Sequence, residues 1–155
     1  MNRQTRAFVP VLALAAGILV SCASGPHVQK EGDVLRLIDL INQGGVSRVE
    51  GLATVPFVLD SETLYLQSDV DTMWKNLAAA GFRMTQVRFA ATIPVGPESY
   101  TLFNDSFDMK NYFAKYAGRD TSVVTVDTAE GRYYLLLERK LRGYPRIQGL
   151  KGPIQ

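Results

Sequence analysis

Apolar residues recur at helical spacing in three segments of the chain. Asp33 precedes the first stripe, and Ser68 or Asp69 precedes the second; these are residue types that cap helix N-termini. A third stripe follows the polar residues 104–106, and a glycine closes each stripe. The stripes consist of Val34, Leu37, Ile38 and Ile41; of Val70, Met73, Trp74 and Leu77; and of Met109, Tyr112, Phe113 and Tyr116. The pattern predicts three amphipathic helices, each with one face toward a core.

Runs of alternating or continuous apolar residues predict five strands. A strand at 53–59 reaches a polar turn at 60–62, and the chain returns in a strand at 63–67. Pro56 lacks a backbone N–H, so the first of these strands is expected at a sheet edge or with a bulge. The remaining strands are expected at 82–92, 121–127 and 132–141, with residues 143–147 extending or curling the last one.

The predicted order is helix, two strands, helix, strand, helix and two strands. Parallel alternation of strands and helices is not sustained along this order, which favours an α+β fold with an antiparallel sheet. We expect a single domain at 33–150, followed by a tail at 151–155.

The first residues have the pattern of a bacterial sorting signal. Arg3 and Arg6 precede uncharged residues at 7–20, a run that suits a signal-peptide core and is too short to span a bilayer. The tetrapeptide Leu-Val-Ser-Cys that ends at Cys22 resembles the lipobox of bacterial lipoproteins. The resemblance implies a signal peptide at 1–21 and a mature chain whose first residue, Cys22, carries a diacylglycerol thioether and a further acyl chain such as palmitate.

Acylation at Cys22 would place the protein in the cell envelope, facing the periplasm or the outside. Ala23 follows the cysteine where an Asp commonly retains lipoproteins at the inner membrane, so the outer membrane is favoured in a host with two membranes. Residues 22–32 are small, polar and rich in breakers, which predicts a tether, and the single histidine, His27, is expected there as a solvated residue. The implied partners are the bilayer and the lipoprotein processing and sorting machinery.

The amino-acid composition excludes several kinds of functional site. Of 155 residues, 46% are hydrophobic, as in folded proteins, and the single Cys and single His exclude a disulfide framework or a multi-histidine metal site. Removal of residues 1–21 leaves fifteen basic and fifteen acidic residues, so a neutral mature chain gives no electrostatic case for nucleic-acid binding. No glycine-rich phosphate loop follows a predicted strand. We expect no metal and no cofactor.

Two parts of the predicted domain resemble a known superfamily. Residues 55–62, followed by the second predicted helix and residues 80–82, resemble a pattern found in the nuclear transport factor 2 superfamily. Residues 131–135 and 144–150 are similar to its long terminal hairpin. The resemblance implies a curved antiparallel sheet packed on two or three helices, forming a cone with a pocket at its open end. Another α+β sandwich fits the same element order.

An enzyme of that superfamily, ketosteroid isomerase, indicates which chemistry such a pocket can carry: a carboxylate base and an oxyanion-stabilising tyrosine or acid. The candidate residues for a pocket or a partner surface are Asp60, Glu62, Tyr65, Trp74, Tyr100, Tyr112 and Tyr116. No spacing in the sequence brings them together. We therefore hold three hypotheses: a non-catalytic domain that binds an envelope ligand or protein, a cofactor-free isomerase or dehydratase, and a structural subunit of an envelope assembly that uses the sheet edge near Pro56. The third is close to the first.

Overall fold

The computed structural model describes residues 28–155. Its helices are α1 (Glu31–Asn42), α2 (Val46–Glu50), α3 (Gln67–Ala79), the 3₁₀ helix η1 (Ser99–Leu102) and α4 (Phe107–Tyr116). Its strands are β1 (Ala53–Leu59), β2 (Glu62–Leu64), β3 (Arg88–Pro94), β4 (Thr121–Thr128), β5 (Gly131–Glu138) and β6 (Arg146–Ile154). The predicted signal peptide and Cys22 lie outside the described residues. None of the helices in residues 28–155 has both the length and the hydrophobicity of a membrane-spanning segment.

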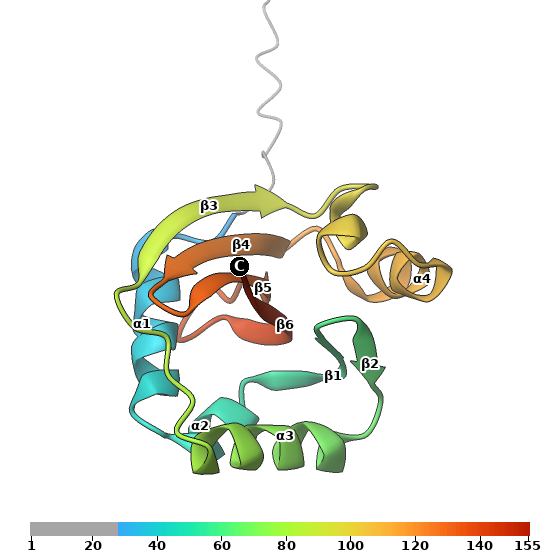
Figure 1. Cartoon of the computed structure of the whole chain (residues 1–155). Helices are drawn as coiled ribbons and strands as arrows, with labels where there is room; N and C mark the ends of the chain where they lie inside the picture. The colour runs from blue at the N-terminus through green and yellow to red at the C-terminus, as the bar shows by residue number, and fades with distance from the viewer. Residues whose placement is uncertain (1–27) are drawn as a thin grey trace, which may run out of the picture.

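The six strands form one curved sheet in the order β2-β1-β6-β5-β4-β3 (Figure 1). All neighbouring strands pair antiparallel except β1 and β6, which run parallel, so the sheet is mixed. The parallel pair arises because the chain enters the sheet at β1 and returns beside this strand only at the very end, in β6. The α+β class with helices on a curved sheet is confirmed.

One face of the sheet, here called the inner face, packs on α1, α2 and α3. Side chains of this face alternate along each strand, as a pleated strand requires, and include Phe57, Val124, Leu135 and Ile147. They meet the predicted apolar stripes of α1 and α3, of which Val34, Leu37 and Val70 are fully buried. The principal core lies between these two layers.

The opposite, outer face is covered by η1 and α4, which lie in the connection between β3 and β4. Each inner-face residue has a sequence neighbour that points to the outer face. These neighbours, Val58, Val123 and Leu136, pack on Phe103 and Met109. Figure 1 shows α1 and α4 on opposite sides of the sheet. Both faces of the central strands are therefore buried, which explains why β1 is apolar at consecutive positions.

Several predicted boundaries need correction. Residues 82–87 are not a strand, and β3 begins only at Arg88. The chain at 143–147 does not continue β5; β6 is a separate strand that runs to Ile154, so residues 151–154 belong to the sheet and not to a tail. The predicted return strand at 63–67 is only the three-residue β2, and α2 is absent from the predicted elements.

The helix starts differ from the predicted caps in two of three cases. The residue before α1 is Lys30, with Asp33 in the first turn, and the residue before α3 is Leu66; neither provides a side-chain cap. Ser106 does cap α4, because its hydroxyl accepts a hydrogen bond from the N–H of Met109. The predicted tether also ends early: Gln29 is buried and α1 begins at Glu31.

Candidate functional site

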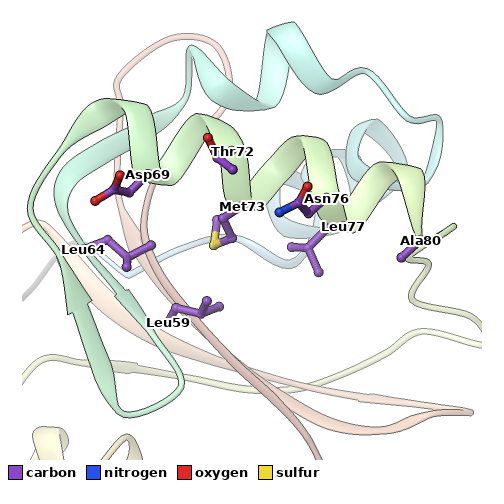
Figure 2. A pocket seen from close by; sticks show the side chains of 8 residues that line it. All are labelled: Leu59, Leu64, Asp69, Thr72, Met73, Asn76, Leu77 and Ala80. Carbon is purple, nitrogen blue, oxygen red and sulfur yellow. The ribbon is translucent and has the colours of Figure 1, made fainter.

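An apolar recess lies between α3 and the β1–β2 hairpin. It has a volume of about 580 Å³ and opens to solvent. Its lining residues are Leu59, Leu64, Asp69, Thr72, Met73, Asn76, Leu77 and Ala80. In Figure 2, Leu59 and Leu64 point from the strands toward Met73 and Leu77 of the helix. We refer to this recess as the α3 pocket.

The sequence forms this pocket because β2 is short. Met73 and Leu77 lie four residues apart, on the face of α3 that the apolar stripe predicts to be buried. Beyond Leu64 the chain leaves the sheet and enters α3, so no further strand residue covers this side of the helix. Met73 is buried by the core, whereas Leu59, Leu64 and Leu77 are only half-buried. Apolar surface thus remains accessible at the pocket wall.

Polar groups occur along the helical rim of the pocket. Asp69, Thr72 and Asn76 are exposed on α3, and the Thr72 hydroxyl donates to the carbonyl oxygen of Ser68. The one charged lining residue is Asp69, and no lysine or arginine lines the recess. The electrostatics of the described pocket therefore favour a neutral or cationic group at the rim over an anionic one.

Trp74 lies beside the α3 pocket, on its core side. Its ring packs edge-on against Phe57 with centroids 6.3 Å apart, and only 4% of the residue is exposed. The indole N–H has no hydrogen-bond partner among the described residues. The ring lines a cavity of about 20 Å³ between α2 and α3, which is large enough for one water molecule. Trp74 is thus a core residue and does not line the pocket for a larger ligand.

Three predicted tyrosines, Tyr100, Tyr112 and Tyr116, belong to the cluster at the outer face. The rings of Tyr112 and Tyr116 lie 5.4 Å apart, and the ammonium of Lys115 lies 5.0 Å from the centre of the Tyr116 ring. Burial raises the pKa of Tyr112 strongly, with smaller contributions from the neighbouring Tyr116 and Tyr65. The Tyr112 hydroxyl is shared between the carbonyl oxygens of Pro56 (2.9 Å) and Gln148 (3.1 Å), so it is already bonded to the sheet.

Tyr100 is the third tyrosine of this cluster, whereas Tyr65, Asp60 and Glu62 do not belong to it. Tyr100 is buried in η1, with the Lys110 ammonium 5.9 Å from its ring centre. Asp60 is exposed, has a positive φ of 52°, and accepts a hydrogen bond from the N–H of Gly152. Glu62 is exposed at the start of β2.

The isomerase hypothesis requires a carboxylate and a tyrosine hydroxyl facing one apolar space. In the α3 pocket the carboxylate is Asp69, and no tyrosine lines the recess. The part of the chain that the structure describes holds no group of three or more potential metal ligands. The α3 pocket therefore presents an apolar surface, and its lining pairs no carboxylate with a tyrosine hydroxyl.

The apolar stripe assigns Met73 and Leu77 to the core and does not predict them as pocket residues. Leu59 and Leu64 likewise carry the pattern of ordinary strand residues. One sequence feature could have identified these four residues as pocket residues: β1, a tight turn and the start of α3 follow one another within a few residues. A return strand of three residues cannot cover a helix of more than three turns.

Comparisons with known proteins do not assign the chain to a family. No protein-family model matches it, and no curated protein matches it.

Proposed function

We propose that the protein is a lipid-anchored component of a bacterial cell envelope whose α+β domain binds an apolar ligand without catalysis. The observation that carries the ligand proposal is the α3 pocket, because its wall consists of half-buried Leu59, Leu64 and Leu77. Exposed apolar surface is costly in water, and a concave apolar recess with a few polar groups at the rim is the usual form of a small-molecule site.

The volume and charge of the α3 pocket limit the size and chemistry of the ligand that it could bind. A recess of about 580 Å³ accommodates a molecule of drug or lipid-fragment size. Since Asp69 is the charged group at the rim, the ligand is expected to carry a neutral or cationic polar end and an apolar body. The curved sheet, the terminal β5–β6 hairpin and a pocket beside the β1–β2 hairpin also support the proposal that the domain is a cone of the nuclear transport factor 2 type.

Photolabelling tests the pocket. The full chain in its own membrane is exposed to a neutral hydrocarbon probe that carries a diazirine, and labelled residues are mapped by peptide mass spectrometry. We expect label on Leu59, Leu64 and Met73. Leu77→Trp fills the recess and should remove this label, whereas Ala79→Trp, at an exposed position of the same helix, should leave it unchanged. The ligand proposal is refuted if no label appears in the recess. It is also refuted if Leu77→Trp, folded as judged by native near-ultraviolet circular dichroism, leaves the label unchanged.

Metabolic labelling tests the anchor separately. A radioactive fatty acid supplied to cells should be incorporated into the wild-type chain and not into Cys22→Ser, because the serine hydroxyl does not form the thioether. Incorporation into the serine variant would contradict acylation at Cys22 and leave the pocket proposal unaffected.

A further inference from the structure

The connection between β5 and β6 is a cationic loop with an apolar residue at its centre. Residues 139–146 contain four basic residues and no acidic one: Arg139, Lys140, Arg142 and Arg146. Arg146 pairs with Glu138, with its guanidinium 3.7 Å from the carboxylate. Within residues 28–155, no carboxylate forms an ion pair with Arg139, Lys140 or Arg142. Three positive charges of this loop are therefore not neutralised by the described part of the chain.

Leu141 lies between Lys140 and Arg142 and is 95% exposed. The base of the loop is fixed, since the N–H of Arg139 donates to the carbonyl oxygen of Asp120, Pro145 is buried and Tyr144 packs against the core. Only the tip therefore projects a leucine into solvent. A lysine, an exposed leucine and an arginine in succession provide the two contacts that an interfacial segment makes with a bilayer, charge on phosphate and an aliphatic group among the acyl chains.

The start of the described chain lies at the same end of the domain. Gln29 is buried, and its side-chain N–H donates to the carbonyl oxygen of Leu137, two residues before the loop begins. From Cys22 to Val28 the chain has six residue steps, which span at most about 20 Å even when fully extended. An acyl group on Cys22 would therefore hold a membrane surface within about 20 Å of Val28, at the end of the domain that carries the loop.

We propose that the loop at 139–145 docks on an anionic phospholipid surface, with Lys140 and Arg142 at the headgroup phosphates and Leu141 in the interface. The loop is a second membrane contact beside the anchor, and it fixes which end of the domain faces the bilayer. The short reach of this contact rests on the proposed acylation of Cys22, whereas the charge and exposure of the loop do not.

Site-specific fluorescence tests the docking in the acylated protein. Acylated Cys22 has no free thiol, so a Leu141→Cys variant takes up a single environment-sensitive nitrobenzoxadiazole label. The protein is reconstituted in vesicles of phosphatidylcholine alone or with about one third phosphatidylglycerol. We expect a blue-shifted emission and quenching by lipid-borne nitroxide at position 141 only in the anionic vesicles, and loss of both in high salt.

Two control variants locate the effect. Ser61→Cys places the same label beyond the end of β1, and β1 begins beside the start of β6, so this label lies at the opposite end of the strand from the loop. It should stay solvent-exposed in both vesicles. Addition of Lys140→Gln and Arg142→Gln to the Leu141→Cys chain should lower the equilibrium constant for docking about thirtyfold.

The outcomes separate this inference from the proposed anchor. Two labels per Leu141→Cys chain would show that Cys22 carries a free thiol, which refutes the anchor. Titration of that chain with vesicles, compared with the Ser61→Cys control, would then still test whether the loop docks. One label with equal emission in neutral and anionic vesicles refutes the docking and leaves the anchor standing. A blue shift that needs envelope proteins in addition to phospholipid also refutes it, in favour of a protein partner.

Discussion

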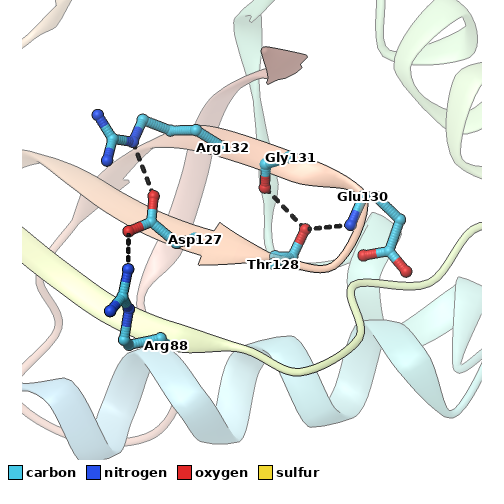
Figure 3. Close-up of polar contacts among 6 residues, drawn as sticks. All are labelled: Arg88, Asp127, Thr128, Glu130, Gly131 and Arg132. Atoms are coloured by element: carbon cyan, nitrogen blue, oxygen red, sulfur yellow. Dashed lines mark hydrogen bonds and ion pairs between the residues drawn. The ribbon is translucent and has the colours of Figure 1, made fainter. Parts of the chain in front are cut away.

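Glu130 accepts two hydrogen bonds from Thr85, one from the backbone N–H at 2.9 Å and one from the side-chain hydroxyl. The contact ties the tip of the β4–β5 hairpin to the irregular segment that precedes β3. Figure 3 shows the turn itself, where the Thr128 hydroxyl bridges the N–H of Glu130 and the carbonyl oxygen of Gly131. These bonds fix the turn in a conformation in which the Glu130 carboxylate accepts both hydrogen bonds from Thr85.

Acid should weaken this contact. The hydrogen bonds from Thr85 lower the pKa of Glu130 from its ordinary value of 4.5 to about 2. Because the folded-state pKa is depressed, the carboxylate contributes stability above pH 4.5, and this contribution is lost as pH falls toward 2. Urea unfolding of the wild type and Glu130→Gln should therefore differ at neutral pH and converge near pH 2. Glu62→Gln, at an exposed position, should not reproduce the difference.

Tyr112→Phe should destabilise the domain by about 1–2 kcal/mol. The lost hydroxyl bridges carbonyl oxygens of β1 and β6 at the place where their register shifts. Denaturant unfolding measures the difference in the free energy of unfolding. Tyr65→Phe removes a hydroxyl from a residue that is 66% exposed and should change that free energy by less than about 0.5 kcal/mol. Equal effects would contradict the structural role of the Tyr112 hydroxyl.

Gly149→Ala should destabilise by about 1–3 kcal/mol. A Cβ at this position of β6 would lie 3.0 Å from both the Cβ and the carbonyl oxygen of Val58 in β1, and 3.4 Å from the Cβ of Leu136 in β5. Backbone on one side and a buried side chain on the other leave little room to adjust. Gly118→Ala is the matched control, since a Cβ there meets no atom within 4 Å. Thermal unfolding should separate the two variants by several degrees.

Lys151→Met should loosen the covering of the outer face. The ammonium of Lys151 donates to the carbonyl oxygens of Leu102 (2.9 Å) and Phe103 (2.6 Å), which end η1 without other side-chain partners among the described residues. Its removal is expected to cost about 1–2 kcal/mol and to increase amide exchange in η1. Lys140→Met, at an exposed loop position, provides the control. Unchanged exchange at Phe103 and Asn104 would contradict the prediction.

Much of the fold follows from local pattern. The stripes of α1, α3 and α4 and the alternation in β4 and β5 are predictable because each element has one consistent period. Helix α2 escapes prediction because five residues are too short to show a period. Residues 82–87 resemble a strand in sequence because they contain Phe82, Met84 and Val87; Met84 is instead buried through a loop, with its N–H and carbonyl oxygen bonded to the side chain of Asn42.

The candidate site is less predictable, because it depends on which apolar residues stay uncovered. No local pattern tells that Leu77 remains half-buried while Val70 is fully buried on the same helical stripe. That difference comes from the length of β2 and from the path of the chain into α3. The tyrosines are candidates by residue type, and three of them do cluster, but the hydroxyl of Tyr112 is bonded within the sheet.

The η1–α4 segment has a consequence for self-association. Because it occupies the outer face while α1 to α3 occupy the inner one, the central strands offer a second copy no bare surface for stacking sheet upon sheet. Within the described residues, the open edges of the sheet run along β3 on one side and along β2 and the first half of β1 on the other. Any homo-oligomer that uses this sheet would have to grow sideways, by extending the ladder.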